Sequence, residues 1–279
     1  MRKYKKIFVE ERTKKMKIYH MTNHTLSQMM GFIIRTGNAV IAVDGGRDGD
    51  TEEFRRIVAE EGNHIDLWIL THPHADHIHV FHEVCKEPQG ITVDKVWYSP
   101  VSRAWTEEHE LIFIADHDLF LAAEKICPFP MEIPERGSIH KVGNCTIDVL
   151  YTADESVPEG GLNNMSLVTK LTEGDFSLLL LGDLGVRGGQ IMLEQFPDRI
   201  KCTAVQMAHH GQNGCDFPVY QATGAKYFIF CAPDWLWSNT PPGAPEGSGP
   251  WQTLVVRGWV EELGGTPLTA IDETKVYEF

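Results

Sequence analysis

The chain has 279 residues, of which 42% are hydrophobic and 23% charged, and these values are typical of one globular domain with a sizeable core. It has no apolar run long enough to cross a bilayer and no N-terminal secretory signal, so we expect a soluble cytoplasmic protein without a membrane partner. The net charge of −14 argues against a broadly basic surface and does not favour nucleic acid as a partner, because such binding depends on phosphate neutralisation by Lys and Arg.

Residues 1–16 predict a basic arm in front of a single domain at residues 17–279. Lys and Arg dominate this arm, and its acidic residues are Glu10 and Glu11. We expect the arm to be solvated, and a tether to nucleic acid or to an acidic partner is the less favoured alternative. The six cysteines form no C-x-x-C pair, and we expect them to be buried free thiols.

Taken in chain order, the first half of the chain alternates short strands with helices. Strands are predicted at residues 17–20, 30–35, 39–43, 66–70 and 93–98. A helix is expected to begin at Asp50, because Glu53 three residues later would complete a capping box. Residues 104–126 carry apolar side chains at helical spacing and predict a second, long helix.

The second half of the chain is also rich in strands. They are predicted at residues 147–151, 166–171, 176–181, 203–207, 227–230 and 275–279. Pro and Gly are frequent in residues 238–250, which predicts a loop, and a helix is expected at residues 251–263. Two strand-rich halves with helices between them favour one α/β domain of two sheets covered by helices.

Three histidines and one aspartate lie within the six residues from His72 to His77, directly after a predicted strand. His72 and His74 would point to the same side of an extended loop, so both can bind one cation. Asp76 and His77 follow at the start of the next helix and can bind a second cation beside the first. A His-rich surface turn is the alternative, but histidines clustered this densely usually bind metal.

Two later strands also lead to residue types that bind metals. The strand at 176–181 is followed by Asp183, and the strand at 203–207 is followed by His209 and His210. A carboxylate at the end of a buried strand is costly unless it is paired or bound to metal. Taken singly, Asp183 is compatible with a helix cap and His209 with a core histidine, but together with the first cluster they predict one metal centre.

The order His-x-His-x-Asp-His, then Gly-Asp, then His-His-Gly, each after an apolar strand, resembles the metallo-β-lactamase-fold superfamily. The resemblance extends over most of the chain from about residue 16 and implies a four-layer αββα sandwich. The sequence LNNMSLV at 162–168, followed by LLLGD at 179–183, is similar to the soluble hydrolase domain of competence DNA-uptake proteins and to bacterial phosphorylcholine esterases. The transmembrane channel of the competence proteins has no counterpart in this sequence, so the channel function does not carry over.

The resemblance also implies a role for each candidate residue. The implied metal ligands are His72 and His74 for the first metal, Asp76, His77 and His209 for the second, and Asp183 as the bridge. Asp76 would also orient the nucleophile, and His210 would face the substrate as a hydrogen-bond donor or general acid. The opposite choice, with His210 as the ligand in place of His209, is open at this point.

One departure from the family pattern concerns a further histidine, which many members carry in a Gly-His-Thr motif before the bridging aspartate. This chain has no histidine from residue 141 to residue 208, and Asn163 and Asn164 stand near the expected place. We expect Asn164 to contact the metal, a water bound to it, or the substrate. The departure argues against a β-lactamase or lactonase of the familiar type.

We therefore expect a hydrolase that uses two divalent metal ions and a bridging hydroxide on a phosphodiester or a phosphate-containing ester. Zn²⁺ is the expected metal, and Mn²⁺ or Fe are alternatives. The less favoured functions are hydrolysis of another ester or a lactone, a di-iron oxidoreductase, and a binding module without turnover. Di-iron relatives place an acidic residue where His74 stands and carry a flavin domain that this chain lacks.

Overall fold

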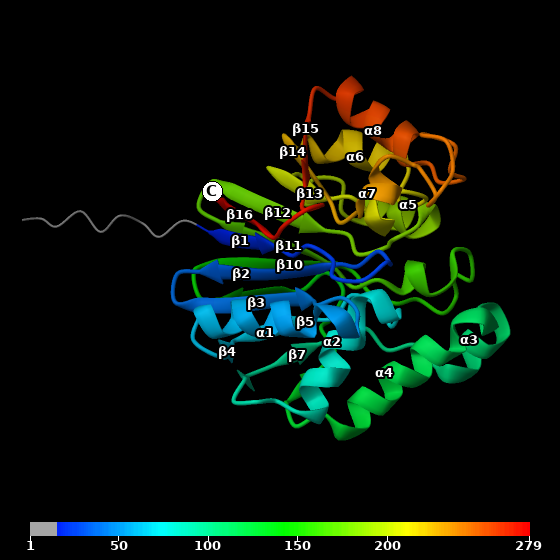
Figure 1. Cartoon of the computed structure of the whole chain (residues 1–279). Coiled ribbons are helices and arrows are strands. Elements are labelled where there is room, and N and C mark those ends of the chain that lie inside the picture. The colour runs from blue at the N-terminus through cyan, green and yellow to red at the C-terminus, as the bar shows by residue number, and fades with distance from the viewer. Residues whose placement is uncertain (1–15) are drawn as a thin grey trace, which may run out of the picture.

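Two β-sheets lie face to face at the centre of the molecule, and helices cover the outer side of each sheet (Figure 1). The computed structural model describes residues 16–279. Helices from residues 51–126 cover one sheet, and helices from residues 186–262 cover the other. This arrangement confirms the predicted four-layer αββα sandwich.

The first sheet has seven strands within the described residues. Their order is β16 (Lys275–Glu278), β1 (Lys17–His20), β2 (Gly31–Thr36), β3 (Ala39–Asp44), β5 (Leu67–Ile69), β7 (Val96–Trp97) and β8 (Met131–Glu132). The strands from β16 to β3 are antiparallel, and those from β3 to β8 are parallel. Strand β16 therefore lies beside β1, although the two are far apart in the sequence.

The second sheet also has seven strands in the described part of the chain. Their order is β15 (Thr266–Thr269), β14 (Tyr227–Phe230), β13 (Ala204–Gln206), β12 (Phe176–Leu180), β11 (Val168–Glu173), β10 (Cys145–Tyr151) and β9 (Ile139–Val142). The strands from β9 to β12 are antiparallel, and those from β12 to β15 are parallel. Because β12 and β13 run in the same direction, the residues that follow them lie together beyond the carboxyl ends of these strands.

The helices divide between the two outer faces. Those on the first sheet are α1 (Thr51–Glu60), α2 (Ala75–Lys86) and α4 (Ile114–Ile126), and α3 (Arg103–His109) lies next to α4, away from the sheet. Those on the second sheet are α5 (Val186–Gln195), α6 (Phe217–Thr223), α7 (Asp234–Trp237) and α8 (Thr253–Glu262). In residues 16–279, four short 3-10 helices lie in connections, namely η1 (Asp48–Asp50), η2 (Leu111–Phe113), η3 (Gly161–Met165) and η4 (His209–Gly211).

Two of the predicted elements are divided in the structure. The single strand predicted at 93–98 is wrong, because β6 (Thr92–Val93) pairs with β4 (His64–Ile65) while β7 pairs in the first sheet. The long helix predicted at 104–126 is interrupted at Glu110, whose φ of −151° is not helical. The Glu110 carboxylate accepts a hydrogen bond of 2.5 Å from the Leu162 amide, and this contact from outside the segment stabilises the break.

The capping box predicted at Asp50 and Glu53 is not formed. Helix α1 begins at Thr51, as expected, but the Asp50 side chain makes no cap hydrogen bond to it. The Asp50 carboxylate instead accepts hydrogen bonds from the backbone amides of His24 (2.6 Å) and Arg47 (2.9 Å). Asp50 therefore joins two loops that precede the helix.

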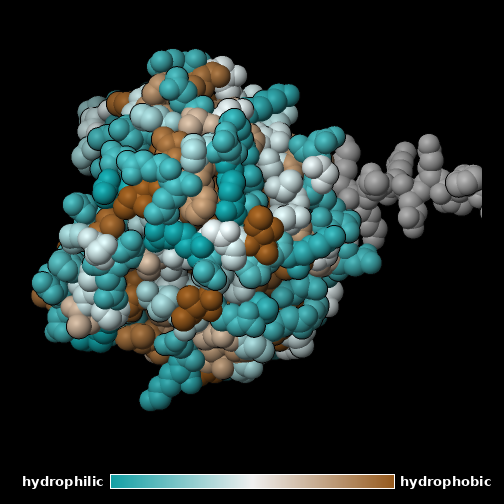
Figure 2. Space-filling model, turned by 180° about the vertical axis from the view of Figure 1, so that it is seen from behind, coloured by the Kyte–Doolittle hydropathy of each residue, from teal (hydrophilic) through white to brown (hydrophobic). Residues whose placement is uncertain are grey.

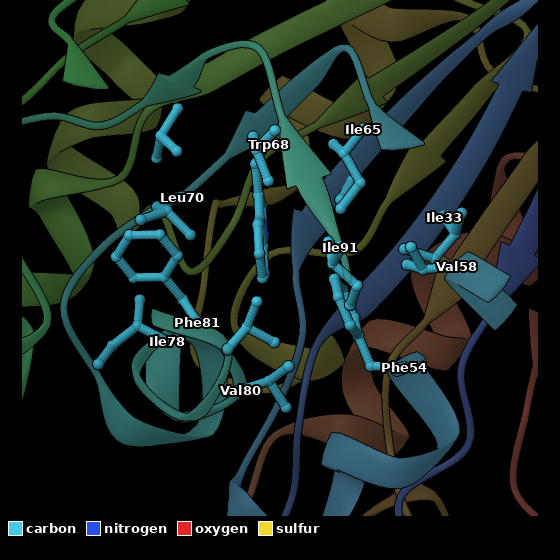
Figure 3. Close-up of a cluster of buried hydrophobic side chains, with 14 of the residues drawn as sticks. Ile33, Phe54, Val58, Ile65, Trp68, Leu70, Ile78, Val80, Phe81 and Ile91 are labelled. Carbon is cyan, nitrogen blue, oxygen red and sulfur yellow. The ribbon is translucent and has the colours of Figure 1, made fainter. Parts of the chain in front are cut away.

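Trp68 on β5 lies at the centre of the packing between the first sheet and its helices (Figure 3). Its ring stacks on Phe54 of α1 at a centroid distance of 4.7 Å and meets Phe81 of α2 edge-on at 5.2 Å. All three side chains are fully buried. This aromatic contact fixes α1 and α2 against β5, the strand that leads into the His-rich segment.

Most of the predicted basic arm, residues 1–15, lies outside the described residues. Met16 is described, and it is fully buried in the core between the two sheets. The six cysteines are free thiols, of which four are buried and Cys127 and Cys202 are half-buried. Within residues 16–279, none of the helices combines the length and the apolar composition of a membrane span.

We expect Phe54→Ala to lower the free energy of unfolding by about 3–5 kcal/mol, because it leaves a cavity beside Trp68. Urea unfolding followed by tryptophan fluorescence would measure the change. Leu26→Ala is the control, because the Leu26 side chain is 97% exposed, and it should change the value by less than about 0.5 kcal/mol. Equal losses in the two variants would contradict the packing role of Phe54.

Candidate metal centre

The candidate metal-binding residues come together beyond the carboxyl ends of four strands. In the first sheet, β3 ends at Asp44 and β5 leads through Thr71 to His72. In the second sheet, β12 leads to Asp183 and β13 leads to His209. Both sheets therefore contribute to one cluster at the same edge of the sandwich.

Asp183 lies at the centre of this cluster, with its carboxylate buried among four histidine side chains. The distances from its oxygens to the histidine Nε2 atoms are 3.3 Å for His77, 3.4 Å for His210, 3.8 Å for His72 and 3.9 Å for His209. A carboxylate with imidazoles on all sides fits the bridging position that the sequence resemblance implied.

Two overlapping groups of side chains are close enough to hold cations. One group consists of His72, His77 and Asp183, and the other of Asp76, His77 and His210, with the ligand atoms of each group within 4.8 Å of one another. Oδ2 of Asp76 lies 3.2 Å from Nε2 of His210, which lies 3.3 Å from Nε2 of His77. All five side chains are buried, so a cation held here would be shielded from water.

His74 lies beside the first group, as the His-x-His spacing predicted. Its Nδ1 is 3.0 Å from Nε2 of His72, so the two nitrogens face the same point. Its Nε2 is buried without a hydrogen-bond partner in the described part of the chain and lies 3.9 Å from a carboxylate oxygen of Glu110. Among the described residues, His74 is not in either group of side chains close enough to hold a cation, so its role as the second ligand of the first cation stays a prediction.

Asp44 orients His77, although the sequence pattern assigned Asp44 only to a turn. Its Oδ2 accepts a hydrogen bond of 2.7 Å from Nδ1 of His77, which leaves Nε2 free to face the cluster. The Asp44 carboxylate also accepts hydrogen bonds of 2.7 Å from the Thr71 amide, at Oδ1, and from the Thr71 hydroxyl, at Oδ2. The signal for this role is the one used for Asp183, a carboxylate at the end of an apolar strand.

The turn His209–Gly211 gives its two adjacent histidines different positions beside Asp183. Its three residues have φ values of 51°, 56° and 81°, and positive φ is unfavourable for histidine. The turn directs His210 inward, where Nδ1 donates a hydrogen bond of 2.9 Å to the carbonyl of Cys231 and Nε2 faces the carboxylates. The side chain of His209 is 22% exposed and lines a cavity. The geometry therefore favours His210 as the ligand and His209 as the substrate-facing residue, the reverse of the first expectation.

The charges within the cluster shift the pKa values of its members. Burial disfavours the charged form of His210, but Asp183 and Asp76 outweigh burial and raise its pKa to about 9. For His77, burial is likewise outweighed by Asp183 and Asp44, which raise its pKa well above the usual value. Burial works to raise the pKa of Asp183, but His77 and His210 hold it well below the usual range. In the absence of metal, protons on the two histidines therefore balance the buried carboxylates.

Asn164 has a structural role, and its expected contact with metal or substrate is not supported. Its Oδ1 accepts hydrogen bonds from the amides of Gly185 (2.8 Å) and Gly188 (3.2 Å) at the start of α5, and its Nδ2 donates to the carbonyl of Glu159. The neighbouring Asn163 lines the cavity, and its Oδ1 is buried without a hydrogen-bond partner in the described residues. Asn163 is thus the member of the pair that is available to a ligand.

The cluster fits two divalent cations by the chemistry of its donors. Imidazole nitrogens and carboxylate oxygens are ligands that zinc, manganese and iron share. In the described residues, His74 Nε2 and Asp183 Oδ1 are buried without hydrogen-bond partners. Such orphaned atoms are costly unless a ligand meets them.

A cavity of about 180 Å³ opens beside the cluster. Its lining consists of Gln28, Arg47, His74, Asp76, Phe113, Asp116, Asn163 and His209. Arg47 was not predicted from the sequence as a site residue, and it brings a guanidinium group to this wall. Its Nε is buried without a hydrogen-bond partner, and within residues 16–279 no carboxylate lies at ion-pair distance from it. The wall therefore has one cationic residue, Arg47, together with two acidic residues, Asp76 and Asp116.

The sequence profile of the metallo-beta-lactamase superfamily matches residues 28–138, which include the whole His-rich segment. ComE operon protein 3 of Bacillus subtilis is 27% identical over 160 residues, which are 57% of this chain and 18% of that protein. The chain therefore matches less than a fifth of the length of this curated relative.

Solved structures share the fold over nearly the whole chain. The metallo-beta-lactamase fold protein YhfI of Bacillus subtilis has a TM-score of 0.58 at 14% identity, covering 95% of this chain and 100% of that one. CmlA, a diiron β-hydroxylase of Streptomyces venezuelae, has a TM-score of 0.62 at 13% identity, covering 95% of this chain and 54% of that one. At these identities the likeness shows the fold.

We expect His210→Ala to weaken zinc binding by roughly 100-fold or more, because it removes a buried ligand held by a backbone carbonyl. His209→Ala is the matched variant at the adjacent position and should bind zinc within roughly threefold of the unmodified protein. Competition with a chromophoric chelator and the zinc content per chain would measure both. If His209→Ala weakens zinc binding more than His210→Ala does, His209 is the ligand and His210 is not.

We also expect the metal-free protein to lose thermal stability as the pH rises from about 6.5 to above 9. The folded pKa of His210 is raised, so its contribution is fully present below the unfolded pKa of about 6.5 and is lost as the pH passes about 9. Melting temperatures of metal-free protein across this range would test the effect, with His210→Gln expected to show a weaker dependence. A melting temperature that rises with pH would contradict it.

Proposed function

Because this chain is a member of the metallo-β-lactamase superfamily, we propose that it is a hydrolase that binds two divalent cations and cleaves a phosphodiester or another phosphate ester. The observation that carries the proposal is the buried cluster around Asp183, which adjoins a cavity lined by polar side chains. The proposed ligands are His72 and His74 for the first cation, Asp76, His77 and His210 for the second, and Asp183 as the bridge. Zinc is the proposed metal.

Hydrogen bonds from neighbouring residues orient the proposed ligands before any cation binds. When bound, the cations would lower the pKa of a water molecule and offset the negative charge that develops in the transition state. Asp44 fixes the ring of His77, and the carbonyl of Cys231 fixes the ring of His210, so that both Nε2 lone pairs face the cluster. Asp76 lies both in the cluster and in the cavity wall, which suits the orientation of the attacking water.

His209 is the proposed hydrogen-bond donor to the substrate. Its Nδ1 lies 3.4 Å from the carbonyl of Asn213, and its Nε2 lies 3.9 Å from Asp183. Burial lowers the pKa of His209 and favours its neutral ring. A neutral ring carries a single N–H, so donation to the substrate from Nε2 requires the tautomer that has its proton on Nε2 and leaves Nδ1 unprotonated beside the Asn213 carbonyl. In the reaction, water adds to phosphorus, the bond from phosphorus to the alcohol oxygen breaks, and the alcohol leaves with a proton.

Arg47 supports an anionic substrate over a neutral ester or lactone. A guanidinium group forms strong, directional hydrogen bonds to phosphate oxygens, and this one has no carboxylate partner in the described chain. Two bound cations would add to the positive charge of the cavity.

Nucleic acid stays disfavoured as a substrate by the net charge of −14. The cytoplasmic location also stays a prediction.

A di-iron oxidoreductase is the second candidate, because CmlA shares the fold over 95% of this chain. His74 argues against it, since di-iron relatives place an acidic residue at this position. Metal analysis of the purified protein separates the two functions. Two irons per chain with a visible absorption band would favour the redox function, and two zinc ions would favour hydrolysis.

We expect zinc-loaded protein to hydrolyse bis-p-nitrophenyl phosphate, and Asp183→Asn to lower kcat/KM by roughly 1,000-fold or more, because the bridging ligand is lost. Release of p-nitrophenol and the zinc content of each variant would be measured together. Asp48→Asn, which removes an exposed carboxylate, is the control and should keep full activity. Absence of phosphodiester turnover by protein with two zinc ions would contradict the proposed function.

A further inference from the structure

Three large apolar side chains follow one another in the 3-10 helix η2, of which Phe113 lines the cavity, and we call Leu111–Phe113 the apolar lip. Phe113 lines the cavity, and its ring centroid lies 4.6 Å from that of His74. Leu111 and Ile112 directly precede it and are 61% and 84% exposed. The surface seen in Figure 2 is largely hydrophilic with hydrophobic residues scattered over it, so a run of three exposed apolar residues beside a candidate active site is unusual.

The apolar lip is held in place by hydrogen bonds at its base. Glu110 accepts a hydrogen bond of 2.5 Å from the Leu162 amide through its carboxylate and one of 3.0 Å from the Phe113 amide through its carbonyl. On the preceding helix α3, the indole of Trp105 donates a hydrogen bond of 2.9 Å to the carbonyl of Glu155. The lip is therefore fixed beside the cavity, with its side chains in water.

We propose that the apolar lip binds an apolar group of the substrate itself, so that the preferred substrate is an amphiphilic phosphate ester. Its phosphate lies in the cavity beside Arg47, and its apolar group lies over Leu111 and Ile112. The phosphate part of this inference rests on the proposed function, whereas the apolar part rests on the lip.

The size of the cavity favours this substrate class. The cavity of about 180 Å³ is small, so a long alkyl substituent on the phosphate would extend out of it. Phe113 lines the cavity and the exposed Leu111 and Ile112 directly precede it, so a substituent that leaves the cavity past Phe113 and covers them would remove apolar surface from water. An amphiphilic phosphate ester can contact both features, because its anionic head can bind beside Arg47 and its apolar tail can cover the apolar lip.

The charges around the lip disfavour a second copy of the chain or an anionic membrane as the occupant. Helix α3 carries the exposed Glu107 and Glu108 directly before the lip, and the chain has a net charge of −14. Either alternative would bring further negative charge against these carboxylates. A single amphiphile brings one phosphate, which Arg47 and the metal centre neutralise.

Isothermal titration calorimetry of the zinc-loaded full chain with octyl phosphate and methyl phosphate tests the inference without relying on turnover. We expect octyl phosphate to bind at least roughly tenfold more tightly than methyl phosphate. The double variant Leu111→Ser/Ile112→Ser should lose most of this preference and keep its affinity for methyl phosphate. Ile139→Ser is the matched control, because Ile139 is 62% exposed on β9, and it should keep the preference.

Three results would overturn the inference. It fails if the unmodified protein binds the two phosphates equally, or if the double variant keeps the preference. It also fails if the double variant changes the mass of the particle in solution by light scattering, since the lip would then cover a second copy. Octyl phosphate preference without turnover of bis-p-nitrophenyl phosphate would support the lip and contradict the hydrolase, and turnover without preference would do the reverse.

Discussion

The burial of the Asp183 carboxylate is the constraint on which the rest of the centre depends. A lone carboxylate inside a protein is costly, so cationic groups must meet it. In the metal-free protein these groups are the protonated rings of His77 and His210, whose pKa values are raised for this reason. Metal ions would replace those protons, which couples metal binding to pH and to stability.

The centre also connects the two halves of the sandwich. His72 and His77 come from the first sheet and its helix, whereas Asp183 and His210 follow strands of the second sheet. Ions held between them would link the sheets across the edge of the core. The positive φ values of Asp44, His209 and His210 lie at this same edge, where the local strain is offset by the contacts that it makes possible.

The sequence predicts most strands and the His-x-His-x-Asp-His segment, because both depend on local pattern and spacing. It does not determine which of His209 and His210 turns inward, since that depends on a backbone turn fixed by tertiary packing. Tertiary packing also gives Asn163 and Asn164 different roles. The side chain of Asn164 accepts a hydrogen bond from the Gly185 amide at the start of α5. The role of Asp44 could not be predicted for a different reason. Asp44 belongs to the sequence Asp-Gly-Gly, and a turn alone is enough to explain an aspartate there.

The pairing of β16 with β1 has a consequence for the synthesis of the chain. On the ribosome, β1 emerges among the first strands, but its neighbour β16 emerges nearly 260 residues later. During this interval β1 is the edge strand of the first sheet, a position that β16 takes in the finished fold, and open edges readily pair with other chains and aggregate. The sheet that carries the His-rich segment is therefore completed only when translation of β16 has finished, and folding of the whole sandwich must wait for that closure.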